Sequence, residues 1–264
     1  MSSGVHRINT YVPASERAYH VGILFAPGHA AWVVHDVNSG SPVAMAWGTD
    51  EGVLRHADLP RDPRAVSYVA LPEWSTMIPT GALDPAHAEA HLALVHGALR
   101  GSPLRHEHVA VLGAECLYRS EDAHTARVLE RFPNARSIPL QSMLARIACD
   151  RSVGRDHMLL HRDVGRVDIA VAKDRRLSLS SSFPARTAED VLYFALLAAE
   201  RTGCDPRTMH VDSGGSESTA DERALLDRYF MHHGTASRWP GVTLPGQERV
   251  ERFFAAFEQF ACVS

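Results

Sequence analysis

Residues 157–184 read HMLLHRDVGRVDIAVAKDRRLSLSSSFP, and their pattern decides the fold. Residues 158–163 are apolar and then polar, residues 167–172 alternate between two faces, and residues 177–183 form a third run. Alternation with period two is typical of half-buried strands. A glycine lies in the first break and a charged cluster in the second, which indicates two tight hairpin turns. The stretch therefore predicts three antiparallel strands, followed by an apolar helix that begins at Thr187 with a capping-box motif.

A second copy of this pattern lies near the N-terminus. Residues 20–48 read HVGILFAPGHAAWVVHDVNSGSPVAMAWG, again strand, glycine-containing turn, strand, polar turn and strand. His20 and His157 begin the two copies about half the chain apart. Because the pattern repeats while residue identity is low, we predict an internal duplication at the level of structure.

Each copy is followed by helix and strand patterns in alternation. The prediction is an α/β chain of two ribonuclease-H-like lobes, as in the actin-like ATPase fold. We place the first lobe at 19–153, with a small hairpin insertion at 65–79, the second at 154–264, and a poorly ordered N-terminus at 1–18. A phenylalanine stripe at helical spacing in 250–260 predicts a last helix that packs on a sheet.

Composition excludes several classes of function. The 264 residues carry a formal net charge of −4, so no overall basic field favours nucleic acid as a partner. No run approaches the ~18 apolar residues that span a membrane, and the N-terminus lacks the apolar core of a signal peptide. The four cysteines show no paired spacing, which indicates reduced thiols. We expect a cytoplasmic protein.

Several short motifs carry a resemblance to a known family. They are residues 76–79 before Leu83 and Asp84, residues 187–194 (TAEDVLYF) and residues 209–216 (MHVDSGGS). Together with the opening strands they resemble an uncharacterised bacterial family, domain-of-unknown-function family 3822, which is grouped with the actin-like ATPases. The resemblance covers most of 19–260. Its nearest relatives with known roles are similar to actin-like scaffolds of type IV pilus assembly and cell division.

The resemblance implies where a nucleotide would bind. Active members of the superfamily hold phosphates between two glycine-containing turns, with Asp residues for the metal and a Gly-Gly loop for the adenosine, because backbone N–H groups reach phosphate where side chains are absent. Here the first turn keeps Gly28, but Pro27 removes an N–H and no Asp precedes it. The second keeps Asp163 and Gly165. Gly214 and Gly215 match the adenosine loop best.

We therefore interpret the chain as a pseudo-ATPase: a non-hydrolysing or weakly nucleotide-binding scaffold that acts through a protein partner or self-association. The alternative is an active Mg-dependent ATPase or phosphotransferase of the same superfamily. In that case Asp163 would orient Mg²⁺, Gly28 and Gly165 would admit the phosphates of Mg-ATP, and Gly214 and Gly215 would seat the adenine. The alternative gains if Asp163 faces an open, acidic, solvated cleft near Gly214. It loses if Asp163 forms a salt bridge with Arg162 or Arg166 and Pro27 and His29 fill the cleft.

A third interpretation is a ribonuclease-H-type nuclease. It would need acidic side chains grouped on adjacent strands to hold two metal ions. Asp36, Asp163 and Asp168 are the candidates, and they are spread over both predicted lobes and opposite strand faces.

Overall fold

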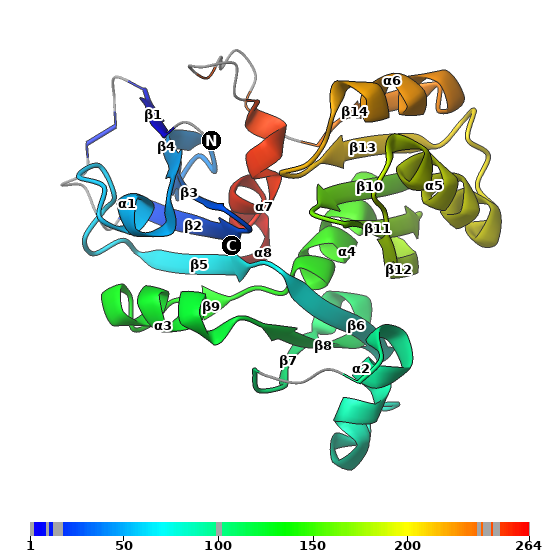
Figure 1. Cartoon of the computed structure of the whole chain (residues 1–264), viewed down its shortest axis with the longest axis horizontal. Helices are drawn as coiled ribbons and strands as arrows, with labels where there is room; N and C mark the ends of the chain where they lie inside the picture. The colour runs from blue at the N-terminus through cyan, green and yellow to red at the C-terminus, as the bar shows by residue number, and fades with distance from the viewer. Residues whose placement is uncertain are drawn as a thin grey trace. The chain divides into compact units, whose positions relative to one another are not determined.

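The computed structural model describes residues 3–8, 11–12, 18–98, 102–236, 239, 244 and 249–263 (Figure 1). They form two compact units, and each takes several stretches of the chain. The first unit contains the described residues of Met1–Glu73, Ser120–Ile138 and Trp239–Ser264. The second contains those of Trp74–Arg119 and Pro139–Arg238. This partition differs from the division at 153/154 that we predict from the sequence.

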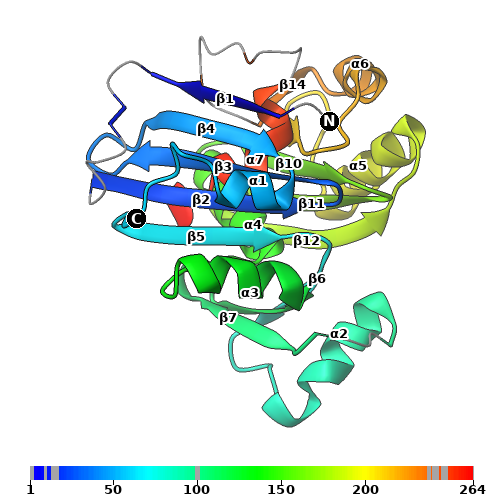
Figure 2. The ribbon, with the colours of Figure 1, turned by 60° about the vertical axis from the view of Figure 1, so that its left-hand side comes forward.

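A six-stranded sheet forms the centre of the first unit (Figure 2). Its order is β1 (Gly4–Arg7), β4 (Pro42–Gly48), β3 (His29–Asp36), β2 (Tyr19–Ala26), β5 (Ala65–Ala70) and β9 (Arg136–Ser137). β2, β3 and β4 are antiparallel neighbours, whereas β5 runs parallel to β2 and β9 parallel to β5. The helices are α1 (Asp50–Leu54), α3 (Asp122–Arg131), α7 (Phe254–Phe257), which follows a 3₁₀ turn at Val250–Phe253, and α8 (Phe260–Val263).

Two layers of helix cover this sheet. On one face the indole N–H of Trp32 donates to the carbonyl oxygen of Val53 in α1, 3.1 Å away. On the other face a Cβ at Gly22 would lie 2.4 Å from the carbonyl oxygen of Ala256, so only glycine lets α7 approach β2 this closely. Phe253, Phe254 and Phe257 are buried. The predicted packing of the last helix on a sheet is confirmed, although the helix is broken into three short pieces.

A buried polar chain ties the C-terminal segment to the sheet. The Ser67 hydroxyl donates to Oε1 of Gln259 (2.7 Å), and the Gln259 amide donates to the carbonyl oxygens of Ile23 (2.8 Å) and Ala255 (2.7 Å). Nε2 of His20 lies 2.9 Å from the same Ser67 oxygen and is therefore the N–H that donates to it. Gln259, fully buried, thus has its polar atoms paired, as a core amide requires.

A five-stranded sheet forms the centre of the second unit. Its order is β12 (Arg176–Pro184), β11 (Arg166–Lys173), β10 (Asp156–Asp163), β13 (His210–Gly214) and β14 (His232–Thr235). β10, β11 and β12 are antiparallel neighbours, and β13 and β14 continue the sheet in parallel with β10. Strand for strand this matches the sheet of the first unit from β4 to β9, as a duplication predicts.

Helices cover both faces of this sheet as well. One face of β10 and β11 is apolar and packs on α5 (Ala188–Thr202) and α6 (Ala220–Tyr229). The opposite face meets α4 (Leu140–Arg151), where the Gln141 side chain bonds Ser180 and Ser182 of β12. Thr187 with Asp190 forms a complete capping box for α5, as the sequence predicts, and Thr219 with Glu222 forms another for α6.

A separate three-stranded sheet also belongs to the second unit. Its order is β6 (Glu73–Pro79), β8 (Ala114–Ser120) and β7 (Arg105–Val109), with a 3₁₀ turn (Pro85–His87) before α2 (Ala88–His96) and another (Ala110–Leu112) after β7. Asp84 accepts from the N–H of Ala86 and so caps the first turn. Ser142 of α4 donates to Glu107 of β7.

Two sequence expectations need correction. The hairpin over 65–79 is not formed, because β5 belongs to the six-stranded sheet and β6 to the three-stranded one. Part of the N-terminal stretch is ordered: β1 pairs with β4 at the sheet edge, while residues 1–2, 9–10 and 13–17 lie outside the described residues.

Candidate functional site

Four of the five predicted nucleotide-site residues gather at one edge of the second sheet. Asp163 ends β10, Gly165 lies in the β10–β11 turn with φ +71°, and Gly214 ends β13, the parallel neighbour of β10. Gly215 follows at once. The fifth residue, Gly28, lies in the β2–β3 turn of the first unit. The structure thus brings the second turn and the Gly-Gly loop together.

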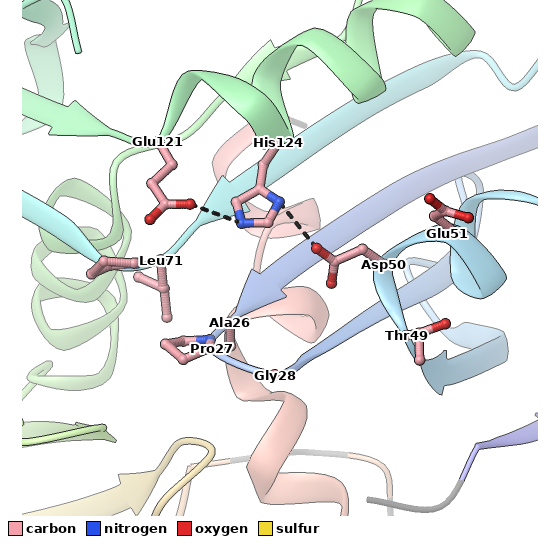
Figure 3. A pocket seen from close by; sticks show the side chains of 10 residues that line it. Ala26, Pro27, Gly28, Thr49, Asp50, Glu51, Leu71, Glu121 and His124 are labelled. Atoms are coloured by element: carbon pink, nitrogen blue, oxygen red, sulfur yellow. Dashed lines mark ion pairs between the residues drawn. The ribbon is translucent and has the colours of Figure 1, made fainter. Parts of the chain in front are cut away.

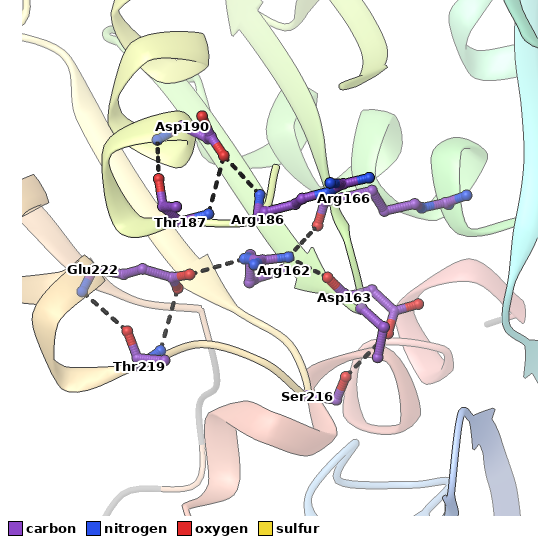
Figure 4. Close-up of polar contacts among 10 residues, drawn as sticks. Arg162, Asp163, Arg166, Arg186, Thr187, Asp190, Ser216, Thr219 and Glu222 are labelled. Carbon is purple, nitrogen blue, oxygen red and sulfur yellow. Dashed lines mark hydrogen bonds and ion pairs between the residues drawn. The ribbon is translucent and has the colours of Figure 1, made fainter. Parts of the chain in front are cut away.

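Asp163 is held by donors from both segments (Figure 4). Its carboxylate oxygen Oδ1 accepts the backbone N–H of Val164 at 2.8 Å and the hydroxyl of Ser216 at 3.1 Å. The residue is 1% exposed. A carboxylate that leaves water needs such donors. Asp163 therefore joins the β10–β11 turn to the loop after β13.

Arg162 lies on the opposite face of β10 from Asp163 and bonds to α6 and to the β10–β11 turn. Its guanidinium pairs with Glu222 of α6 (Nε to Oε1, 2.8 Å) and donates to the carbonyl oxygens of Asp163 and Arg166. Burial raises the pKa of Glu222, although the neighbouring Arg162 acts in the other direction. The ion pair fixes the β10–β11 turn against the start of α6.

A second arginine lies against the face of β10 and β11 that meets α4. Arg166 donates to both oxygens of Asp168 at 3.0 Å, and the Ser182 hydroxyl donates to Oδ1 as well. Asp168 is fully buried. The fully buried His161 lies opposite Asp168 in the strand register, and burial lowers its pKa while Asp163 and Asp168 raise it. The two arginines form ion pairs with Glu222 and Asp168, while Asp163 receives hydrogen-bond donors.

Gly215 has a structural reason to be glycine. Its φ is +112°, and a Cβ there would lie 2.2 Å from the carbonyl oxygen and 2.7 Å from the nitrogen of Arg162. Real side chains do not occupy such space, so the loop can cross the end of β10 only without one. The role of Gly214 and Gly215 in seating an adenine stays a prediction.

The first glycine turn borders a cavity of about 800 Å³ (Figure 3). Ala26, Pro27 and Gly28 form one side, and Leu71 and Pro72 add apolar surface. Three carboxylates line it, Asp50 and Glu51 from the start of α1 and Glu121 from the start of α3. Among the described residues that line the cavity there is no lysine or arginine.

His124 lies between two of these carboxylates. Its Nδ1 is 3.3 Å from Oδ2 of Asp50, and its Nε2 is 3.5 Å from Oε2 of Glu121. The imidazole stacks on Phe25 with ring centroids 4.7 Å apart and an interplanar angle of 15°. Arg127 also contacts Asp50, with 3.3 Å between Nη1 and Oδ2. The stack and the carboxylates hold the imidazole ring at the cavity wall.

Sequence reasoning missed this cavity. Its residues come from four stretches, 26–28, 49–51, 71–72 and 121–124, and no short motif contains them. A signal was present in part, because Thr49 followed by two acidic residues is a helix start, and Thr49 does accept the N–H of Gly52. Only the packing of α1 and α3 on the same sheet could show that their acidic first turns meet.

No group of three histidine, cysteine or acidic side chains is placed to hold a metal ion in the described part of the chain. The Mg²⁺ role of Asp163 therefore stays a prediction. Within the same part of the chain, no helix is long and apolar enough to cross a membrane.

A family model described as "Protein of unknown function (DUF3822)" matches residues 65–232. The chain belongs to this family. The match confirms the resemblance carried by the motifs at 76–84, 187–194 and 209–216. A search of the curated proteins finds no match.

Solved structures show the fold. One is a protein from Bacteroides thetaiotaomicron VPI-5482 with an actin-like ATPase fold and unknown function (TM-score 0.72, 13% identity, 86% of this chain and 93% of that one). A chain of the PilM–PilN type IV pilus biogenesis complex is also similar (TM-score 0.53, 12% identity, 93% and 98%). So is the cytoplasmic domain of EpsL, an inner membrane component of the type II secretion system of Vibrio cholerae (TM-score 0.50, 12% identity, 93% and 95%). The DUF3822 chain has the two-lobed actin-like ATPase fold.

Proposed function

We propose that this DUF3822 protein is a non-hydrolysing or weakly nucleotide-binding scaffold that acts through a protein partner or through self-association. The observation that carries the proposal is that the carboxylates of Asp163 and Asp168, beside the Gly165 turn, are both bound by donors from within the chain. Asp163 accepts from Val164 and Ser216, and Asp168 is paired at both oxygens with Arg166.

Mg²⁺ would compete with these contacts. The ion demands near-octahedral oxygen ligands and a net negative site. Arg166 already supplies the positive charge at Asp168, and its displacement would leave a guanidinium, 14% exposed, without that partner. Asp163 could bind Mg²⁺ only by giving up donors or by turning its second oxygen outward. Both changes cost free energy, and this cost would weaken the binding of Mg²⁺ at Asp163.

The first turn adds a second difficulty for a nucleotide. Pro27 has no N–H to donate to a phosphate oxygen. Asp50, Glu51 and Glu121 line the cavity beside this turn, so a polyphosphate would meet like charges. Together these features support binding of something other than a nucleotide.

The comparisons support a partner. One similar chain is a component of a complex with a second protein, and another is a component of a secretion system. These assemblies contain the similar proteins, and a partner for this chain is part of our proposal. We also propose a cytoplasmic location without nucleic-acid ligands, because the four cysteines are buried thiols and the net charge is negative.

An active Mg-dependent ATPase or phosphotransferase remains the second candidate. One observation favours it: the loop with Gly214 and Gly215 reaches Asp163 through Ser216, which is the juxtaposition that a nucleotide site of this superfamily requires. A thermal-shift experiment with Mg-ATP, Mg-ADP and AMP separates the two candidates. A ligand at 100 times its Kd stabilises the folded state by about 2.7 kcal/mol.

We expect at most a small shift with nucleotide at millimolar concentration in the wild type, and no ATP turnover. A shift with Mg-ATP that Asp163→Ala abolishes, together with ATP turnover that the same variant loses, would establish the second candidate instead. The matched control is Glu200→Gln, an exposed acidic residue of α5 in the same unit, which should leave any nucleotide response unchanged.

A further inference from the structure

The cavity beside Gly28 is lined by acidic side chains, and the described residues of its wall include no arginine or lysine. Asp50, Glu51 and Glu121 contribute three carboxylates to its wall. Arg127 approaches Asp50, and Arg55 lies 4.0 Å from Glu51, but neither arginine lines the cavity. The space itself is therefore exposed to negative charge on two sides, above an apolar floor of Ala26, Leu71 and Pro72.

The wall also contains His124, whose ring nitrogens contact the carboxylates of both Asp50 and Glu121. Its buried Nδ1 lies 3.3 Å from Asp50 without the alignment of a hydrogen bond. Asp50 already has Arg127 as a donor, whereas the side chain of Glu121 is 55% exposed. A donor that enters the cavity could therefore reach the Glu121 carboxylate.

We propose that this cavity receives an arginine side chain of the protein partner. The inference rests on the proposed scaffold function and names the chemistry of its contact. A guanidinium presents five N–H donors in a planar fork, enough to reach acidic groups from both α1 and α3. Its aliphatic stem suits the apolar floor. A metal ion fits less well, since the described carboxylates and His124 are too dispersed to ligate one.

The test uses a small probe, the peptide acetyl-Gly-Arg-Gly-amide, titrated into the full chain at low ionic strength and followed by two-dimensional NMR. The same peptide with citrulline in place of arginine keeps the shape and removes the charge. Glu121→Gln removes charge at the open side of the cavity, and Asp50→Asn/Glu121→Gln removes it on both sides. Glu130→Gln is the matched control, because it lies exposed in the same helix α3 and outside the cavity.

We expect saturable shifts at residues 26–28 and 121–124 with the arginine peptide and none with the citrulline peptide. Affinity should fall about threefold in Glu121→Gln and about tenfold or more in the double variant, and it should stay unchanged in Glu130→Gln. Added salt should weaken binding, as expected of charge pairing near a surface. Glu121→Gln alone carries the test if the double variant fails to fold.

Equal binding of both peptides, or equal affinity in Glu121→Gln and Glu130→Gln, would overturn the inference. Shifts at the same residues with MgCl₂ and none with the arginine peptide would make the cavity a metal site instead. These outcomes are independent of the nucleotide experiment. An absent arginine response leaves the scaffold proposal standing, whereas ATP turnover that depends on Asp163 removes the scaffold proposal without deciding what the cavity binds.

Discussion

The turns at Gly28 and Gly165 occupy the same place in two matching sheets, and their surroundings differ in kind. Counted from Gly28 and Gly165, Phe25 stands where the second unit has Arg162, Ala26 where it has Asp163, and Ala31 where it has Asp168. Apolar packing surrounds the first turn, whereas buried ion pairs and hydrogen bonds surround the second. The same backbone topology thus accommodates two different ways of stabilising a hairpin.

The difference has a consequence for binding. Near Gly165 the polar side chains form hydrogen bonds and ion pairs with one another. Their charges and hydrogen-bonding groups are therefore paired within the fold. Near Gly28 the strands carry no charge, and the acidic side chains come from α1 and α3 and face a cavity. A ligand has more to gain beside Gly28, because carboxylates at a cavity wall can accept further donors from outside.

Arg162→Met gives the largest expected effect. The change leaves the Glu222 carboxylate, 5% exposed, without its cation, and a broken buried pair costs about 3–5 kcal/mol of unfolding free energy. Because burial already raises the pKa of Glu222, the loss should shrink as the pH falls and the carboxyl group takes up a proton. Urea unfolding at pH 7 and pH 5 measures both effects.

Arg7→Met in the first unit is the control for that experiment. Arg7 forms an exposed pair with Asp58 (2.9 Å), which should contribute at most about 1 kcal/mol. Arg162→Met/Glu222→Gln should recover part of the stability. If Arg162→Met and Arg7→Met destabilise equally, the second turn does not depend on its buried ion pair.

The two glycines give the next comparison. Gly215→Ala places a Cβ 2.2 Å from the Arg162 carbonyl oxygen at φ +112°, and we expect a loss of about 3 kcal/mol. Gly28→Ala meets no heavy atom within 4 Å in the described structure and pays only for its positive φ of +77°, about 1 kcal/mol. Thermal unfolding of both variants measures the contrast. Equal losses would show that backbone conformation alone demands glycine at both sites.

Acid should weaken the first unit through its buried histidines. Burial lowers the pKa of His20 to about 4 and that of His35 to about 3, the second also through the neighbouring His20. Both values lie below the ordinary 6.5, so the unfolded chain binds more protons, and stability present above pH 6.5 is lost as the pH falls toward the folded pKa values. Between pH 7 and pH 5 we expect a loss on the order of 2 kcal/mol for each histidine.

His35→Phe isolates one part of that effect. His35 stacks on Phe260 of α8 with ring centroids 5.3 Å apart, so phenylalanine keeps the ring contact and removes the titrating group. The variant should lose less stability than the wild type between pH 7 and pH 5, followed by the fluorescence of the buried Trp32. An identical loss would place the acid sensitivity elsewhere in the chain.

The sequence was informative about local structure. Period-two alternation located β2, β3 and β4 and their counterparts β10, β11 and β12, because each side chain of a strand alternates between faces. The capping residue Thr187 located the start of α5, because its side chain satisfies a backbone group a few residues away. These are interactions between near neighbours, which a sequence displays directly.

Prediction was less successful where contacts join distant segments. β5 and β6 lie three residues apart and look like a hairpin, yet β5 pairs with β2 and β6 with β8. The choice depends on which edges the rest of the chain leaves open. Asp50, Glu121 and His124 likewise read as ordinary surface residues until α1 and α3 pack on the same sheet.

By itself the sequence determined the duplicated strand pattern and the family. It also determined the start of α5 and the missing backbone N–H at Pro27. Each of these depends on residue type and short spacing. Only the tertiary structure decided which carboxylates meet an arginine within the fold and which face a cavity. The reason is physical: the energy of a charge depends on its distance from other charges and on its exposure to water, and both are set by segments far apart in the chain.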